Sequence, residues 1–352
     1  MNAIHVSASR PYDVLIGRGL MREIGARAKD ALRGRHVAVV SDDRVAPLYL
    51  AGALESLRAA GFQAESFVLP AGEASKDPAH YIELLRFLAE RQLTRADALI
   101  ALGGGVVGDL TGFAAATYLR GVDCIQIPTT LLACVDSSVG GKTAIDLPEG
   151  KNLVGAFYQP RLVLCDPDAL ESLPGEIFAD GCAEVVKYGM LGSAELLDRL
   201  RARHASQQLE YVISTCVDMK REVVEGDEFD TGRRQLLNLG HTFAHAIERE
   251  SGYQISHGRA VAMGMRLITR AAVEMGECPA DCLSALDALL DMHALPKFTG
   301  LSAEALAAGA LSDKKRAGGQ ITLAVPCGYG ESKLKRVPVS ELIDWARAGL
   351  EP

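Results

Sequence analysis

Residues 98–113 read Ala-Leu-Ile-Ala-Leu-Gly-Gly-Gly-Val-Val-Gly-Asp-Leu-Thr-Gly-Phe, and this stretch decides the fold of the first half of the chain. An apolar run of strand length ends in a cluster of glycines, after which Thr111-Gly-Phe opens a helix. Glycines let a backbone approach a pyrophosphate closely, and a helix N-terminus offers it free N–H groups and the positive end of a dipole. The spacing matches Gly-x-Gly-x-x-Gly, a pattern of dinucleotide-binding turns, although a tight strand-to-helix turn without a ligand also explains it.

The same alternation of short apolar runs and amphipathic stretches extends from about residue 12 to about residue 170. It predicts a Rossmann-like parallel sheet with helices on its faces, that is, an α/β fold. The glycine-rich turn comes late in this series, whereas the standard dehydrogenase fingerprint follows the first strand, so an ordinary Rossmann dehydrogenase is a poor match. The expected strands are 36–40, 64–69, 98–102, 124–127 and 162–165, and the expected helices include 47–60 and 79–91.

Polar loops follow several of these expected strands, at residues 41–43, 70–76 and 128–130. Ligands of parallel sheets bind at the carboxyl ends of the strands, so we expect the loops to share one pocket. Residues 138–143, Ser-Val-Gly-Gly-Lys-Thr, resemble the end of a P-loop but lack the upstream glycine, which argues against an ATPase. Gly-Lys-Asn at residues 150–152 is expected to lie in a loop before the last strand.

A second polar group lies between Arg234 and His257. On one continuous helix, Arg234, Asn238, His241 and His245 would share a face, because residues three or four apart lie on the same side. His257 follows a helix-ending Gly-Tyr segment and is expected to start the next helix, which can bring another imidazole back to the first. Two histidines and one carboxylate would leave zinc an open position for a substrate oxygen, although hydrogen-bonded structural histidines are the alternative interpretation.

A carboxylate for such a site occurs in the stretch Asp-Gly-Cys-Ala-Glu-Val-Val-Lys at residues 180–187. Glu184 and Lys187 are three residues apart on a predicted helix that is otherwise lined with Ala, Val and Tyr, so both emerge on one face. A plain salt bridge explains this pair equally well.

The chain as a whole has 352 residues, which suits two domains of ordinary size. It has no apolar run of about eighteen residues and no signal-peptide layout at its start, so a cytoplasmic enzyme without membrane association is expected. The formal charge of −8 argues against a nucleic-acid surface, so the expected partners are small molecules. The eight cysteines lie mostly in apolar runs, as expected for reduced thiols.

Taken in order, these motifs resemble the 3-dehydroquinate synthases of the shikimate pathway, within the sugar phosphate cyclases, over roughly residues 10–340. The resemblance implies an NAD-binding α/β domain at 1–174, an all-helical domain binding metal and substrate at 175–352, and a cleft between them that closes over the substrate. The motifs are Pro-x-Gly-Glu-x-x-Lys (70–76), Gly-Gly-Gly-Val-Val-Gly-Asp (103–109), Pro-Thr-Thr-Leu-Leu-Ala (128–133), Asp-Ser-Ser-Val-Gly-Gly-Lys-Thr (136–143), Gly-Lys-Asn (150–152), Ala-Glu-Val-Val-Lys-Tyr-Gly (183–189), Leu-Asn-Leu-Gly-His-Thr-Phe-Ala-His-Ala (237–246) and Asp-Lys-Lys (313–315).

The resemblance also implies roles for single residues. Zn²⁺, or Co²⁺ in a mixed N/O site that accepts both, would be held by Glu184, His241 and His257, while His245 would contact the substrate instead. Arg120 would reach in from the neighbouring subunit of a homodimer. Contacts to NAD are implied for Asp42, Glu73, Lys76, Gly104, Gly105, Val106, Asp109, Thr129, Thr130, Asp136, Lys142, Lys151 and Ser172. Contacts to a sugar phosphate substrate are implied for Lys142, Asn152, Lys187, Lys220, Arg234, Asn238, His245 and either Lys314 or Lys315.

Two positions depart from the family pattern. Arg259 stands where a Glu is common, which reverses a charge next to a proposed ligand, and Ser172 replaces a frequent threonine while keeping the hydroxyl.

The implied reaction converts 3-deoxy-D-arabino-heptulosonate 7-phosphate to 3-dehydroquinate and phosphate. NAD⁺ would oxidise the C5 alcohol while zinc stabilises the alkoxide, and the resulting ketone would acidify the C6 proton. Phosphate would leave by β-elimination, NADH would return the hydride, and ring opening with an intramolecular aldol step would close the carbocycle. Because the hydride is returned, NAD acts as a catalyst and the enzyme is a carbon–oxygen lyase acting on phosphates.

Three other functions are alternatives. A sister cyclase would make an inosose or a valiolone-type ring, but Asn152, Lys220 and Arg234 together favour a substrate that bears a carboxylate. A metal-dependent polyol dehydrogenase of related fold would form NADH from an alcohol as a net product. A non-catalytic binding protein would have lost metal ligands, and none of the three is lost.

Overall fold

The computed structural model describes residues 1–312 and 319–350. Within these ranges the chain forms two compact units. The first consists of Met1–Pro174 and Cys216–Phe229, and the second of Gly175–Thr215 and Asp230–Pro352, so the helix α7 (Leu209–Gly226) contributes to both. No helix in the described ranges has the length and apolar character required to cross a membrane.

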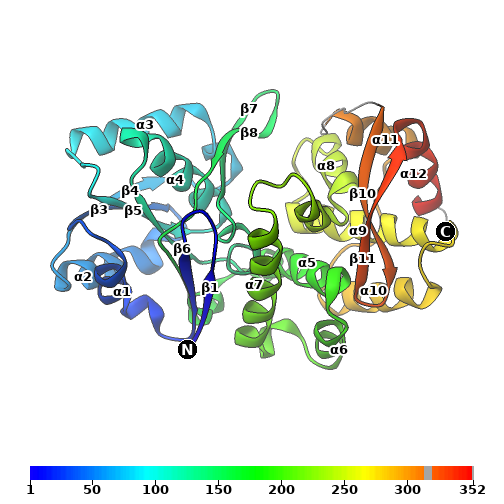
Figure 1. The fold of residues 1–352 in the computed structure, drawn as a ribbon, viewed down its shortest axis with the longest axis horizontal. Helices are drawn as coiled ribbons and strands as arrows, with labels where there is room; N and C mark the ends of the chain where they lie inside the picture. Colours follow the sequence, from blue (N-terminus) through cyan, green and yellow to red (C-terminus); the bar gives the residue numbers. More distant parts are fainter. Residues whose placement is uncertain (313–318, 351–352) are drawn as a thin grey trace. The chain divides into compact units, whose positions relative to one another are not determined.

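The first unit is built on a seven-stranded sheet with the order β1-β2-β9-β6-β5-β3-β4 (Figure 1). All neighbouring strands are parallel except β1 and β2, which form an antiparallel pair at one edge. A separate antiparallel hairpin joins β7 and β8. The strands are β1 (Asn2–Val6), β2 (Tyr12–Ile16), β3 (His36–Asp42), β4 (Gln63–Leu69), β5 (Ala98–Gly103), β6 (Asp123–Pro128), β7 (Lys142–Leu147), β8 (Gly150–Phe157) and β9 (Leu162–Cys165).

Helices cover both faces of this sheet (Figure 1). Apolar residues of α1 (Ile24–Ala31) and α2 (Ala51–Ala59) pack on one face, and those of α3 (Pro78–Glu90) and α4 (Gly105–Thr117) pack on the other. The central strand β5 is buried along its whole length, because both of its faces are covered. The sequence pattern therefore gave the correct layer arrangement.

The five strands expected from the sequence are confirmed as β3, β4, β5, β6 and β9, and the expected parallel α/β fold is confirmed with them. The helices expected at 47–60 and 79–91 are present, the first with residues 46–50 as a π-helical turn that leads into α2. Two local expectations were wrong. The helix after the glycine run begins at Gly105 and not at Thr111. Residues 150–152 lie in strand β8 and not in a loop.

The strand order places a topological switch between β3 and β5. The chain continues outward from β3 to β4, crosses back to β5, and then continues on the other side to β6 and β9. Crevices that bind ligands form at such points, outside the carboxyl ends of the strands. The loop after β3, with Asp42, and the glycine turn after β5 therefore lie at the place where a parallel sheet offers a binding crevice.

The second unit is mainly helical, as expected, but it also contains an antiparallel hairpin of β10 and β11 that the sequence analysis did not predict. Its central helix is α9 (His257–Glu274), which is buried along most of its length and packs against α5, α8, α10 and α12. The remaining elements are α5 (Gly175–Gly192), α6 (Ala194–Ala202), α8 (His241–Glu250), α10 (Ala280–Met292), α11 (Ala303–Ser312), β10 (Gln320–Gly328), β11 (Glu331–Pro338) and α12 (Leu342–Leu350).

Candidate functional site

The histidine-rich segment does not form the single helix that was expected from Arg234 to His245. Residues Arg233–Asn238 form a 3-10 helix, and the chain then breaks at Leu239 (ψ 123°) and Gly240, whose φ of 79° is in the left-handed region. Helix α8 begins only at His241. The predicted start of the next helix at His257 is confirmed, so both of these histidines are the first residues of their helices.

Glycines bring the three helices of this site into close backbone contact. A Cβ on Gly264 of α9 would lie 2.2 Å from the carbonyl oxygen of Gly240, so α8 starts directly against α9. A Cβ on Gly258 would lie 2.2 Å from the carbonyl oxygen of Asp180, so the first turn of α9 also lies against α5. Only glycine fits at these contacts, and they draw the starts of α8 and α9 towards the part of α5 that carries Glu184.

Glu184, His241 and His257 converge, and their ligand atoms lie within 4.8 Å of one another. The Nε2 atoms of His241 and His257 are 3.5 Å and 3.3 Å from the same carboxylate oxygen, Oε1 of Glu184. Ligand atoms about 2.0–2.1 Å from a tetrahedral Zn²⁺ are separated by roughly 3.3 Å, so the spacing suits such an ion. Glu184 is fully buried, whereas the side chain of His257 is 35% exposed and leaves an approach to the site.

The other ring nitrogen of each histidine faces an oxygen acceptor. Nδ1 of His241 lies 3.1 Å from the carbonyl oxygen of Leu239, and Nδ1 of His257 lies 3.5 Å from Oε2 of Glu248. A proton on each Nδ1 would leave the lone pair of each Nε2 directed at Glu184, which is how metal-binding histidines are usually oriented. The three donor atoms and their supporting contacts therefore suit a divalent metal ion.

The charges of the site also favour a cation. Burial lowers the pKa of His241 to about 3, and the nearby Lys187 acts in the same direction. Burial also lowers the pKa of His257, but hydrogen bonds to Glu184 and Glu248 outweigh it and raise the value to about 10. The two rings therefore differ in charge: the His257 ring is protonated and the His241 ring is neutral.

Lys187 forms an ion pair with the second oxygen of Glu184, Oε2. Both side chains are almost fully buried on α5, so the salt bridge that the sequence allowed is present. It does not compete with a metal role, because Oε2 faces Lys187 while Oε1 faces the two histidines.

Among the other predicted residues of this unit, His245 lies beside His241. The ring centroid of His245 is 5.5 Å from that of His241, with the rings nearly perpendicular. Arg234 is buried at 1% exposure in the 3-10 helix, and Asn238 is the last residue of that helix. Lys314 and Lys315 lie outside the described residues.

Arg259 does not bring its charge into the metal centre. Its side chain is exposed, and its backbone N–H donates to Oδ1 of Asp180 at 3.2 Å. Ser256 donates to the same carboxylate oxygen at 2.6 Å, so Asp180 caps the start of α9. The charge of Arg259 therefore lies at the surface and not among the three proposed ligands.

In the first unit, several predicted cofactor residues form one polar cluster around Lys76, which is 4% exposed. Its Nζ donates to Oδ2 of Asp109 at 2.7 Å and to Oδ1 of Asn152 at 2.5 Å, and lies 3.7 Å from Glu73. Glu73 in turn lies 3.9 Å from Nζ of Lys151. Burial lowers the pKa of Lys76, but Asp109 and Glu73 outweigh it, so the ammonium form is stabilised. The loop at residues 70–76 therefore contacts Asp109 of the glycine-rich segment and residues 151–152.

The glycine turn after β5 leaves its backbone open to close approach by a ligand. Gly104 precedes α4 without any side-chain cap, and Cβ atoms on Gly104 and Gly105 would lie 3.1 Å from side-chain atoms of Thr130 and Ser137. Thr129 is 2% exposed, and its hydroxyl oxygen is buried without a hydrogen-bond partner among the described residues. An uncapped helix N-terminus beside a buried unsatisfied hydroxyl suits a phosphate-bearing ligand.

The remaining predicted residues of this unit have more varied surroundings. Nζ of Lys220 donates to Oδ1 of Asp136 at 2.8 Å and to its carbonyl oxygen at 2.5 Å, which joins a predicted substrate residue to a predicted cofactor residue. Asp42 accepts two backbone N–H bonds from residues 44 and 45, so one of its oxygens closes a turn. The Ser172 hydroxyl is 2.7 Å from the Tyr49 hydroxyl and 3.0 Å from the carbonyl oxygen of residue 169.

Val106 is partly buried at the start of α4, whereas Lys142 is exposed at the start of β7. Arg120 is also exposed and has a φ of 66° directly after Leu119 with a φ of 49°. Consecutive left-handed conformations are costly for residues other than glycine, so this turn holds Arg120 in an unusual direction. Lys142 begins a strand and not a helix, which agrees with the conclusion that the segment is no P-loop.

Sequence analysis missed three supporting carboxylates: Glu248, Asp180 and Asp146. Glu248 lies seven residues after His241 on α8, so helical spacing alone places it on the same face. Asp146 accepts a bond from the backbone N–H of Asn152 at 2.8 Å and its own N–H donates to the carbonyl oxygen of Lys76, contacts that the expected loop concealed.

Comparisons with known proteins agree with this arrangement. A family described as 3-dehydroquinate synthase N-terminal matches residues 66–180, and one described as 3-dehydroquinate synthase C-terminal matches residues 181–316. The chain is 44% identical over 350 residues to the 3-dehydroquinate synthase of Xanthomonas campestris pv. campestris (strain 8004), covering 95% of this chain and 94% of that protein. It is 42% identical over 342 residues to that of Streptococcus suis (strain 05ZYH33), covering 95% and 96%.

Solved structures with the same fold include 2-deoxy-scyllo-inosose synthase complexed with carbaglucose-6-phosphate, NAD⁺ and Co²⁺, with a TM-score of 0.88, 26% identity and coverage of 99% and 100%. The 2-epi-5-epi-valiolone synthase of Streptomyces hygroscopicus subsp. jinggangensis 5008, with NAD⁺ and Zn²⁺ bound, also has a TM-score of 0.88 at 26% identity, covering 96% and 95%. An iron-containing alcohol dehydrogenase, at 16% identity and a TM-score of 0.67, shares the fold alone. The two family matches and the relatives at 42% and 44% identity show that this chain belongs to the 3-dehydroquinate synthase family.

Proposed function

We propose that the protein is a lyase that converts 3-deoxy-D-arabino-heptulosonate 7-phosphate to 3-dehydroquinate and phosphate. The observation that carries this proposal is the convergence of Glu184, His241 and His257 in a chain of this family. Identity favours this function over the alternatives, because the chain is 44% identical to a 3-dehydroquinate synthase but 26% identical to the inosose and valiolone synthases. The dehydrogenase of related fold is more distant, at 16% identity.

We propose NAD and Zn²⁺ or Co²⁺ as cofactors, since the two cyclase structures bind them and the donor set here suits such an ion. When bound, NAD supplies reversible hydride transfer and the ion supplies a Lewis acid for a substrate oxygen. In this proposal residues 1–174 bind NAD and residues 175–352 bind metal and substrate. The unsatisfied Thr129 hydroxyl and the uncapped start of α4 support the first assignment.

The chain's own residues have distinct tasks in this proposal. Glu184 would hold the ion through Oε1, while Oε2 pairs with Lys187 and keeps its ammonium group fixed beside the metal ligands. Glu248 and the Leu239 carbonyl hold the two imidazole rings in place. The substrate carries a phosphate and a carboxylate, and an acidic protein with charge −8 must gather cations locally to hold it, which Lys142, Lys187, Lys220 and Arg234 would do.

We further propose a homodimer in which Arg120 acts on the neighbouring subunit. Arg120 is exposed and lies in a turn with two left-handed residues, and its side chain has no ion pair or hydrogen bond within residues 1–312 and 319–350. A guanidinium group so placed suits a phosphate or carboxylate presented from outside the subunit.

The proposed function is tested by phosphate release from the heptulosonate phosphate, using protein freed of NAD and treated with a chelator. We expect no release until NAD and either Zn²⁺ or Co²⁺ are both restored, and no net accumulation of NADH in the absorbance trace. Full activity of the metal-free protein would refute the metal role. Net NADH formation would point instead to a polyol dehydrogenase.

Replacing Glu248 with Gln removes a negative charge behind His257 with little change of volume. We expect metal affinity, measured by competition with a chromophoric chelator, to fall by about 10-fold or more, because loss of such supporting contacts typically costs 10- to 100-fold. Glu250→Gln, on the exposed end of the same helix, is the matched control and should bind metal as the wild type does. Equal affinity in Glu248→Gln and the control would remove Glu248 from the site.

Lys142→Ala tests substrate capture without disturbing the core, because Lys142 is exposed whereas Arg234 is buried. Loss of a charge-assisted contact of about 1.5–3 kcal/mol should lower kcat/KM by about 10- to 100-fold, with the unfolding temperature unchanged. Lys29→Ala, an exposed lysine on α1, should have normal kinetics. Normal kinetics in Lys142→Ala as well would contradict the assignment.

Subunit mixing tests Arg120. Arg120→Ala and Lys142→Ala should each keep about a tenth or less of wild-type activity alone, whereas reassociated mixtures should reach about a quarter or more, since half of the dimers are hybrids with one intact site. No recovery, from hybrids whose formation is verified by differently tagged subunits, would show that Arg120 acts within its own subunit or not at all.

A further inference from the structure

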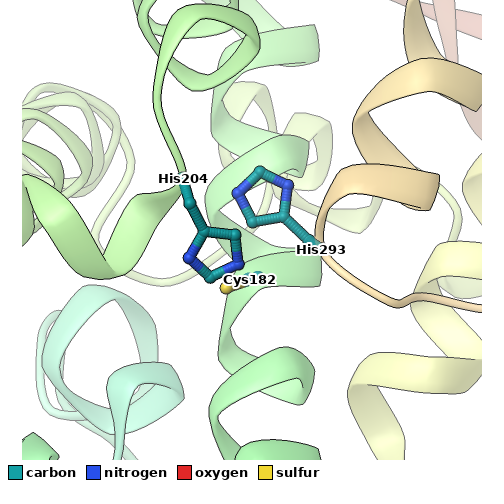
Figure 2. Close-up of side chains that lie close together, drawn as sticks. All are labelled: Cys182, His204 and His293. Atoms are coloured by element: carbon teal, nitrogen blue, oxygen red, sulfur yellow. The ribbon is translucent and has the colours of Figure 1, made fainter.

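A second cluster of metal-binding side chains lies in the helical unit. Cys182 is on α5, His204 follows α6, and His293 directly follows α10. Each offers one ligand atom, and these atoms lie within 4.8 Å of one another. Cys182 and His293 are buried at 0% and 1% exposure, while His204 is partly exposed. The ring centroids of His204 and His293 lie 4.6 Å apart, with 23° between the ring planes. Figure 2 shows the sulfur atom of Cys182 beside the His204 ring.

This cluster is distinct from the proposed catalytic centre. Cys182 and Glu184 are two residues apart on α5, and such residues point about 200° apart around an α-helix. The two donor sets therefore use opposite faces of the same helix. None of the three residues has a part in the proposed reaction.

Hydrogen bonds define which nitrogen of each ring is available. Nδ1 of His293 donates to the carbonyl oxygen of Leu289 at 2.9 Å, so the lone pair is on Nε2, which accepts a long 3.3 Å bond from the N–H of Ala205. Nδ1 of His204 lies 2.8 Å from the hydroxyl of Ser206 and 3.3 Å from the backbone nitrogen of the same residue. When the ring proton is on Nδ1 and is donated to the Ser206 hydroxyl, the lone pair of His204 lies on Nε2 and is available to a ligand.

The sulfur atom of Cys182 has no hydrogen-bond partner in the described part of the chain. A thiol and two imidazoles in a largely buried setting, with the partly exposed His204 at its edge, form a preassembled set of soft and intermediate donors that an ion can approach.

We propose that Cys182, His204 and His293 form a second binding site for a thiophilic divalent cation, namely Zn²⁺. One thiolate and two imidazoles are donors that Zn²⁺ prefers, and water can take the fourth position beside His204. Binding releases the Cys182 proton to solvent and replaces the Ala205 N–H as the partner of His293. The ion would join α5 to the segments that follow α6 and α10, and so stabilise the helical unit.

Cobalt provides a test with a signal specific to this site. The full-length protein is freed of metal under reducing conditions and titrated with Co²⁺, followed by absorbance and by metal analysis after gel filtration. We expect about two equivalents per chain and a near-ultraviolet sulfur-to-cobalt charge-transfer band. The centre formed by Glu184, His241 and His257 contains no sulfur and cannot give this band.

Variants assign the band. Cys182→Ser and His204→Ala should each lower the capacity from about two equivalents to about one, and the band should disappear in Cys182→Ser. Glu184→Gln should lose the other equivalent and keep the band. Cys327→Ser, a partly exposed cysteine outside the cluster, is the matched control and should behave as the wild type does.

The proposal is overturned if the wild type binds one equivalent without the band, or if the band survives both Cys182→Ser and His204→Ala. In that case the three side chains are only a stacked histidine pair over a buried thiol. Because His204 is partly exposed, His204→Ala decides the matter if circular dichroism shows that Cys182→Ser does not fold. These outcomes do not depend on turnover, so they leave the proposed reaction untouched.

Discussion

Direct backbone contact between helices is the constraint on which the metal centre depends. Helix axes normally stay about 8–10 Å apart because side chains separate them. At Gly258 against Asp180, and at Gly264 against Gly240, there is no room for even one Cβ atom. The starts of α8 and α9 can therefore approach α5 closely enough to set Nε2 of His241 and of His257 within 3.5 Å of a single carboxylate oxygen. Glycine residues therefore determine where the metal ligands lie.

Electrostatics follow from this packing. Glu184 is fully buried, and an isolated carboxylate in such a place would cost several kcal/mol. The ammonium group of Lys187 offsets this cost at Oε2, and positive charge beside the two imidazole rings offsets it at Oε1. The pKa of His257, raised to about 10, shows that this side holds a proton when no ion is there, while the pKa of His241 falls to about 3. The two carboxylates, Glu184 and Glu248, thus stabilise one positive charge beside the two imidazole rings.

The sequence predicted the layers of the fold well because hydrophobic periodicity is a local property. The strand from Ala98 and the helix carrying Glu184 were both recognisable from patterns of a few residues. The prediction of one helix from Arg234 to His245 was wrong, because the chain leaves helical geometry at Leu239 and Gly240. There the spacing of polar residues fitted one helix, but contact between Gly240 and Gly264 imposed a left-handed residue, and no local pattern reports such a contact.

The cofactor cluster shows a second limit of the same kind. Asn152 was expected in a loop, whereas it lies in strand β8 and accepts a hydrogen bond from Lys76, 76 residues earlier in the chain. Its strand pairs with β7, so the register of one hairpin decides whether the amide reaches the ammonium group. Side chains of this sort can be named from a motif, but their partners are set by strand register. The same reasoning explains why the Cys182 cluster escaped notice, since its three residues belong to no motif and meet only because α5 packs against the segments that follow α6 and α10.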